Sequence, residues 1–264
     1  VEREMTDNRP IAFFDSGVGG LTVFAKVKKL LPNENYLYFG DTKNMPYGEK
    51  SEKQLIEFAD RIFKFFEKQN AKAVVMACNT TSAITYEKLK DNYNFKIYPI
   101  IQTVCSTLAG LDGVKSLGVI ATPATINSHA YSKGIAKYNK DMKVYELAAP
   151  NWVRIVEEHR IHQPQSIEQI KEILEVMKEN NPDKIVLACT HYPYLLDVLK
   201  KFLPEDKYID PAIFFAQSIK NDLEKNNLLG KEPTYERFYV SSDPENFKIA
   251  SELFYKLDIL PELV

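Results

Sequence analysis

The chain has 264 residues, 45% of them hydrophobic, which is enough to bury a substantial core in one large domain or two small ones. Its net charge of −2 at pH 7 excludes a broadly basic surface of the kind that binds nucleic acids. No apolar run approaches the roughly 20 residues that span a membrane, and the charged residues 1–10 lack the apolar core of a signal peptide, so we expect a cytoplasmic protein.

Strand-like and helix-like segments alternate along the chain. Short apolar runs predict strands at residues 11–15, 36–40, 73–77, 96–100, 116–121, 143–147, 184–188, 207–209 and 238–241. Apolar residues at helical spacing predict helices at 22–31, 55–66 and 167–180. This alternation predicts an α/β fold with mainly parallel sheets.

Two segments far apart in the chain resemble each other. Residues 72–83 read KAVVMACNTTSA and residues 184–195 read KIVLACTHYPYL, so each has an apolar strand, then Ala-Cys, then polar residues that include threonine. A weaker similarity links the turn after residues 11–15 with the turn after residues 116–121. We interpret this pattern as two related α/β halves that face each other.

The chain contains three cysteines, Cys78, Cys105 and Cys189. An odd number this small does not form a disulfide framework. Cys105 lies in an apolar helical stretch, and we interpret it as structural. The four histidines form no zinc-binding pattern with the cysteines, so no metal site is expected.

Cys78 and Cys189 each follow a predicted strand, where ligands bind in open α/β sheets. A following helix would favour the thiolate and lower the thiol pKa, so that each cysteine could exchange a proton at neutral pH. Taken singly, each cysteine could equally be a small buried hydrophobe. The duplicated context favours the chemical interpretation. His191, two residues after Cys189, is either a packed residue at the start of a helix or a group that holds the proton balance of the thiol.

Two further turns follow strands. The Asp15–Gly20 turn has neither the Gly-Lys-Ser/Thr end of a phosphate loop nor the third glycine of a dinucleotide fingerprint. We expect Asp15 to fix an ammonium group or a thiol, while the glycines expose backbone N–H groups. The 45–48 turn is either an ordinary Pro/Gly loop or a place where Tyr47 and the next N–H groups bind a carboxylate.

The sequence resembles bacterial glutamate racemases. The matching segments are FFDSGVGGLTV (13–23), FGDTKNMPYG (39–48), ACNTTSA (77–83), ATPATINSHAY (121–131) and ACTHYPYLL (188–196). They occur in the family's order and extend over nearly the whole chain. Aspartate racemases share the paired cysteines but resemble these turns less.

The resemblance implies a cofactor-independent enzyme that interconverts L- and D-glutamate and supplies D-glutamate for peptidoglycan synthesis. Cys78 would serve the D-glutamate face and Cys189 the L-glutamate face, supported by Asp15 and His191, with Glu157 a further candidate near His191. Trp152 and Arg154 depart from the family pattern before Glu157. By motif position, the substrate would be held by Asp15, Ser16, Pro46, Tyr47, Gly48, Asn79, Thr80, Thr122, Thr125, Thr190 and His191.

The family also implies two pseudo-symmetric α/β domains with the active site between them, and a homodimer. We expect one domain to comprise residues 1–98 and 212–264 and the other residues 99–211. Two other function classes fit the same residues. A two-lobed amino-acid receptor would use the cleft without chemistry, and a thiol hydrolase would pair Cys189 with His191 but leave Cys78 unexplained.

Overall fold

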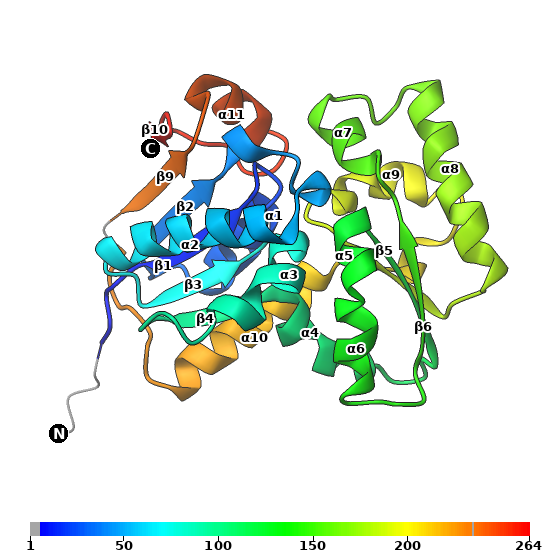
Figure 1. Cartoon of the computed structure of the whole chain (residues 1–264), viewed down its shortest axis with the longest axis horizontal. Helices are drawn as coiled ribbons and strands as arrows, with labels where there is room; N and C mark the ends of the chain where they lie inside the picture. Colours follow the sequence, from blue (N-terminus) through cyan, green and yellow to red (C-terminus); the bar gives the residue numbers. More distant parts are fainter. Residues whose placement is uncertain (1–5, 234) are drawn as a thin grey trace.

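The computed structural model describes residues 6–233 and 235–264 and contains two β-sheets with helices packed around them (Figure 1). The strand pairings within both sheets are parallel. Parallel strands need helical crossovers, and the chain supplies them between successive strands. The predicted α/β architecture with two parallel-sheet domains is confirmed.

The first sheet has six strands in the order β10-β9-β2-β1-β3-β4, and the second has four in the order β6-β5-β7-β8. The first six are β1 Ile11–Asp15, β2 Tyr36–Gly40, β3 Ala73–Met76, β4 Lys96–Pro99, β9 Glu236–Val240 and β10 Glu262–Leu263. The other four are β5 Ser116–Ala121, β6 Lys143–Ala148, β7 Lys184–Ala188 and β8 Tyr208–Ile209. Nine strands were predicted within two residues of these bounds. The two-residue edge strand β10 was not predicted, because it is too short to show an apolar pattern.

The helices lie mostly between strands, as the crossovers require. They are α1 Leu21–Leu30, α2 Glu52–Lys68, α3 Asn79–Leu89, α4 Ile100–Ala109, α5 Pro123–Ser128, α6 Ala130–Ala136, α7 Trp152–Glu157, α8 Pro164–Glu179, α9 Leu196–Leu199, α10 Pro211–Lys225 and α11 Pro244–Ser251. Short 3-10 helices occur at Thr42–Asn44, Tyr47–Glu49, Tyr192–Leu195 and Glu205–Lys207. The predicted helix 167–180 starts earlier, at Pro164, because proline suits the first turn of a helix.

Alternate residues of β1 pack into different cores. Ile11 and Phe13 face a core that includes residues of α1, α4 and α10, whereas Ala12 and Phe14 face one that includes residues of α2. The first of these cores also contains residues of β5 and β7, so it is continuous between the two lobes. A third core lies against α7, α8 and α9 on the other side of the second sheet. Because both sheets share one core, the ends of their strands are held in a fixed relation.

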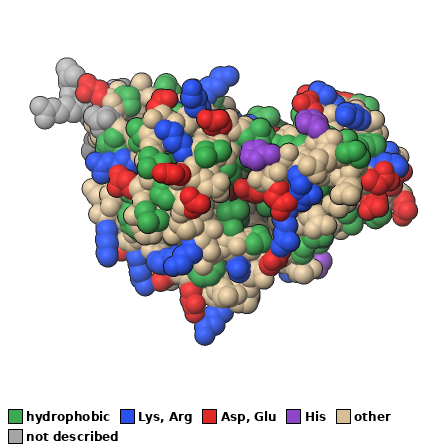
Figure 2. All heavy atoms as spheres, turned by 90° about the horizontal axis from the view of Figure 1, so that it is seen from above, with side chains coloured by type: hydrophobic (Ala, Val, Ile, Leu, Met, Phe, Trp, Pro, Cys, Tyr) green, Lys and Arg blue, Asp and Glu red, His purple; other side chains and the backbone are tan. Residues whose placement is uncertain are grey.

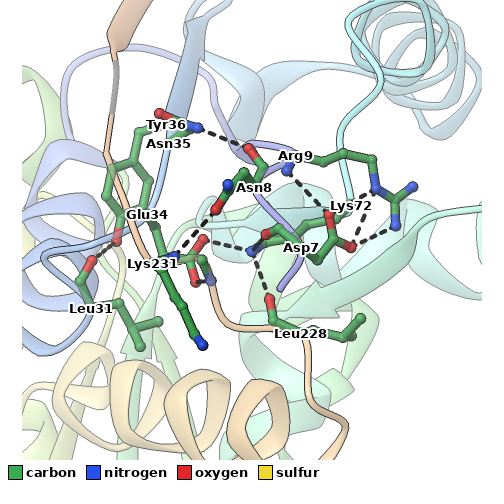
Figure 3. A network of polar contacts seen from close by, with 11 residues as sticks. Asp7, Asn8, Arg9, Leu31, Glu34, Asn35, Tyr36, Lys72, Leu228 and Lys231 are labelled. Atoms are coloured by element: carbon green, nitrogen blue, oxygen red, sulfur yellow. Dashed lines mark hydrogen bonds and ion pairs between the residues drawn. The ribbon is translucent and has the colours of Figure 1, made fainter. Parts of the chain in front are cut away.

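A buried ion pair lies at the amino ends of β2 and β3 in the first sheet, away from the carboxyl ends where Asp15 and Cys78 lie (Figure 3). The Lys72 ammonium, just before β3, lies 2.6 Å from Glu34 Oε2 and donates to the carbonyl oxygens of Asp7 and Leu228 at the same distance. The other Glu34 oxygen accepts from the Gly230 N–H at 2.7 Å. The Lys72 and Glu34 side chains are 0% and 1% exposed. This network joins the segments around Asp7, Glu34 and Leu228 to Lys72, at the start of β3.

Candidate active site

One cavity of about 70 Å³ lies where turns of both lobes meet. By volume it has room for about five water-sized groups, which suits a small ligand. Its lining residues are Ser16, Met45, Pro46, Tyr47, Gly48, Glu49, Cys78, Asn79, Thr80, Thr122, Pro123, Pro150, Val153, Arg154, Cys189, Thr190 and His191. The two cysteines expected to act together therefore face one cavity, each from a different sheet.

Cys78 follows β3 and is the N-cap residue of α3, as its Ala-Cys-Asn context suggests. Its thiol is free and only 7% of the residue is exposed. Burial, together with the nearby Asp15 carboxylate, raises the pKa of Cys78 to about 12. Hydrogen bonds from Thr81, in the first turn of α3, do lower the pKa of this thiol, but burial outweighs them, so the expected net lowering is wrong. Cys78 is a protonated thiol at neutral pH and can donate a proton.

Cys189 follows β7 and has a different environment. Its sulfur lies 3.8 Å from His191 Nδ1, and His191 Nε2 lies 2.5 Å from Glu157 Oε1. Burial alone would lower the pKa of His191, but its hydrogen bonds to Cys189 and Glu157 raise it well above the ordinary value. A protonated imidazole can donate to the Cys189 sulfur through Nδ1 and to Glu157 through Nε2. The helix expected after Cys189 is instead a 3-10 helix, Tyr192–Leu195, followed by the short α9.

Asp15 is the last residue of β1 and is completely buried. One carboxylate oxygen accepts from the Gly17 N–H at 3.0 Å, and the other has no hydrogen-bond partner within the described part of the chain. Burial raises the pKa of Asp15 to about 6, against the opposing effects of His191 and of backbone N–H groups. Asp15 does not line the cavity, but its charge raises the pKa of Cys78, and the charge of His191 lowers the pKa of Asp15.

The Asp15→Asn variant is expected to be more stable than the wild type at neutral pH and less active. The rise in pKa from 3.8 to about 6 means that charging this carboxyl costs the folded state up to about 3 kcal/mol. Because the folded-state pKa is the higher one, this cost is complete above pH 6 and absent below about pH 4. Denaturation at pH 7 and pH 4 measures the gain, which should be present at pH 7 and vanish at pH 4. An equal or lower stability of the variant at pH 7 would contradict the argument.

Gly19 holds the Asp15–Gly20 turn against the Cys189 turn. A Cβ atom built on Gly19 would lie 2.5 Å from Thr190 Oγ1 and would overlap the His191 ring. Only glycine fits this contact without displacing either side chain. Gly19 therefore allows close approach between the two lobes, a role that we did not expect from the sequence.

Polar side chains of α3 and of the turn after β5 meet at the cavity. Thr80 and Thr122 share a hydrogen bond of 2.9 Å between hydroxyl oxygens, and Thr125 lies 3.0 Å from Thr122. The Tyr131 hydroxyl donates to Asn79 Oδ1 at 2.7 Å, which orients the amide. The amide nitrogen of Asn79 is buried and has no hydrogen-bond partner among the described residues. It is therefore a donor available to a ligand oxygen.

The 45–48 turn contributes Pro46, Tyr47 and Gly48 to the cavity wall, next to Ser16 from the first turn. The Tyr47 hydroxyl donates to Asp41 Oδ2 at 2.5 Å. The tyrosine thus offers its ring and backbone to the cavity, while its hydroxyl is occupied. The first N–H groups of the 3-10 helix Tyr47–Glu49 have no partner within that helix.

Most of the predicted site residues line the cavity, and three do not. Asp15, Thr125 and Glu157 stand behind lining residues, with Thr125 bonded to Thr122 and Glu157 to His191. The sequence did not identify Met45, Glu49, Pro123, Pro150, Val153 and Arg154, which also line it. These residues are scattered over loops and short helices, and no pattern in the sequence would reveal that they share one cavity.

The remaining candidates lie elsewhere. Cys105 is buried in α4, and His129, His159 and His162 are exposed. Across residues 6–233 and 235–264, no three His, Cys, Asp or Glu side chains form a group that could hold a metal ion. Nor does any helix in those ranges have both the length and the apolar character to cross a membrane.

Comparisons of sequence and of structure with known proteins identify relatives in one family. The profile of the Asp/Glu/hydantoin racemase family matches residues 20–219. A glutamate racemase of Thermoanaerobacter pseudethanolicus is 39% identical over 249 residues, which are 94% of this chain and 93% of the relative. The crystal structure of a Francisella tularensis glutamate racemase in complex with D-glutamate superposes with a TM-score of 0.89 at 36% identity, covering 98% of both chains. A glutamate racemase isoform from Bacillus anthracis superposes with a TM-score of 0.90 at 29% identity, covering 98% and 97%.

Proposed function

The chain belongs to the glutamate racemases of the Asp/Glu/hydantoin racemase family, and from this premise we propose that it inverts glutamate at Cα by proton transfer between two cysteines. One observation carries the proposal. Cys78 and Cys189 are free thiols, come from different sheets and line the same cavity. Inversion needs a base on one face of Cα and an acid on the other, and two thiols carried into one cavity by different sheets can supply that pair.

The surroundings of the two thiols support distinct roles. Cys189 acts as the base toward L-glutamate, because a protonated His191 beside its sulfur can donate a hydrogen bond to it, and Cys78 acts as the acid, because burial and Asp15 raise its pKa. In the conversion of L-glutamate, Cys189 takes the proton from Cα and the electron pair of the C–H bond stays on carbon. Cys78 then gives its proton to the opposite face, and D-glutamate forms.

The surrounding donors hold the substrate and stabilise the carbanion. The free Asn79 amide, the threonines Thr80, Thr122 and Thr190, and the N–H groups of the 47–49 turn are placed to bind carboxylate oxygens. In a cavity closed to water such donors stabilise developing charge more strongly than they would in solution. This scheme uses only side chains and backbone of the chain and needs no cofactor.

We extend the proposal to the biological setting that the family implies. D-glutamate made by this enzyme would enter peptidoglycan synthesis in the cytoplasm, and the enzyme would act as a homodimer. We also propose that the domains comprise residues 1–98 with 212–264, and 99–211. The membership of the two sheets supports this division, because β1–β4, β9 and β10 form one sheet and β5–β8 the other.

Solvent hydrogen is expected at Cα of the product. A thiol that has taken the substrate proton exchanges it with water, and the proton delivered to the other face comes from a different thiol. In D₂O, D-glutamate formed from L-glutamate should carry deuterium at Cα from the first turnovers, as measured by mass spectrometry. Product that retains the original hydrogen would rule out the two-thiol scheme.

A coupled assay with both enantiomers of glutamate and of aspartate tests the substrate. Racemisation of glutamate without release of ammonia from glutamine would support the proposal. Binding of glutamate without turnover would favour the receptor alternative, and hydrolysis of an amide would favour the thiol hydrolase. Faster turnover of aspartate than of glutamate would overturn the substrate assignment.

A further inference from the structure

An ion pair joins the two lobes at the outer end of the catalytic cavity. Arg154 Nη2, on α7, lies 2.7 Å from Glu49 Oε1, at the end of the 3-10 helix Tyr47–Glu49. Both residues also line the cavity that contains Cys78 and Cys189. One wall of the cavity is thus linked to the other by two charged side chains. The view from above shows acidic and basic side chains lying side by side along the junction of the lobes (Figure 2).

Exposure places this pair at the mouth of the cavity. The Arg154 and Glu49 side chains are 54% and 59% exposed, whereas Cys78 and Cys189 are 7% and 8% exposed. The ion pair is therefore the solvent-exposed part of the cavity lining, and the cysteines are the buried part.

An exposed ion pair of this kind is weak and exchanges partners easily. The arginine guanidinium binds carboxylates through two parallel N–H groups, so an incoming carboxylate competes directly with Glu49. Glutamate has two carboxylates and one ammonium group, so it carries a net negative charge. Arg154 attracts this anion, while Glu49 both repels it and occupies the arginine.

We propose that Arg154 forms an outer carboxylate-binding subsite, which captures the substrate anion at the mouth of the cavity and is masked by Glu49 in the free enzyme. Substrate capture and release of the Glu49 ion pair are then one exchange, in which a substrate carboxylate replaces the Glu49 carboxylate on Arg154. The inference rests on the proposed racemisation of glutamate. It assigns to Arg154 a role in capturing substrate and none in proton transfer.

Three variants test the subsite, with racemisation of L-glutamate measured at low and at high salt. Arg154→Gln should raise KM about fivefold at low salt, as expected for one unit charge at contact distance in a water-like dielectric, and leave kcat nearly unchanged. Glu49→Gln should lower KM, because it unmasks the arginine. The double variant should have a KM below that of Arg154→Gln, because the unpaired Glu49 carboxylate no longer repels the substrate, and above that of Glu49→Gln, because the arginine is absent. The differences should shrink at high salt, because exposed charges are screened.

Arg160→Gln is the matched control, because Arg160 forms an exposed pair with Glu158 and does not line the cavity. It should leave KM unchanged. A salt-independent loss of kcat in Arg154→Gln, or a Glu49→Gln variant with unchanged or higher KM, would overturn the subsite. A wild-type enzyme that does not racemise glutamate would instead refute the proposed function. Equal thermal unfolding of all variants excludes a folding effect.

Discussion

Replacing Cys78 or Cys189 with serine is expected to slow racemisation of glutamate by more than about a hundredfold, the lower range for loss of a general acid or base. Serine keeps the shape of the side chain but is too weak an acid to exchange a proton at neutral pH. Each variant also removes only one of the two groups that the reaction uses in turn. The measurement is turnover in both directions with purified, folded protein.

The two variants should fail in different ways. Cys78→Ser keeps the Cys189–His191 pair, so it should still exchange the Cα hydrogen of L-glutamate with deuterium oxide without forming the D-enantiomer. Cys189→Ser should lose that exchange. Cys105→Ala is the matched control, because Cys105 is buried in α4 away from the cavity, and its activity should match the wild type. Near-normal turnover of either serine variant in both directions would remove that cysteine from the mechanism.

The two thiols have different charged neighbours. Cys189 has a histidine partner that is itself bonded to Glu157, while Cys78 has a buried carboxylate nearby. One environment adds a positive charge next to sulfur, and the other adds burial and a negative charge. Four strands of the first sheet and the four of the second have the same order, β2-β1-β3-β4 and β6-β5-β7-β8, but the charges next to the two cysteines differ. This difference supports the proposed division of roles, in which one cysteine is the base and the other the acid.

The positions of the cysteines could be predicted from the sequence because parallel strands bring their carboxyl ends to one edge. An Ala-Cys pair after each apolar strand was enough to place Cys78 and Cys189 at that edge. The partner of His191 could not be predicted in the same way. Glu157 lies 34 residues before His191 along the chain, and only packing of α7 against the Tyr192–Leu195 helix brings them together. The resemblance alone suggested it.

The net lowering predicted for the pKa of the Cys78 thiol is wrong because the effect of burial is larger than that of the helix N-terminus. A helix N-terminus favours a negative charge by about 0.3–1 kcal/mol. The rise in the pKa of Cys78 from 9.0 to about 12 corresponds to about 4 kcal/mol in the opposite direction. Burial depends on the complete tertiary structure, so a local pattern cannot reveal that it exceeds the helix effect. The Lys72–Glu34 pair escaped prediction for the same reason, since an isolated lysine before a strand normally lies in solvent.

Replacing Lys72 with methionine is expected to destabilise the protein by about 3–5 kcal/mol, the range for removing one partner of a buried ion pair. The Glu34 carboxylate would remain buried with only the Gly230 N–H as a donor, and the carbonyl oxygens of Asp7 and Leu228 would lose theirs. Burial already raises the pKa of Glu34 even with Lys72 in place. The loss would appear as a lower denaturant midpoint at pH 7.

A second substitution separates the charge from the packing. In Lys72→Met with Glu34→Leu, no unpaired charge is buried, and most of the lost stability should return. The destabilisation of Lys72→Met alone should also diminish at low pH, where Glu34 takes up a proton and becomes neutral. If the double variant were as unstable as Lys72→Met, the network would act through its shape and through the segments it joins. Recovery in the double variant would show instead that the unpaired Glu34 carboxylate causes the loss.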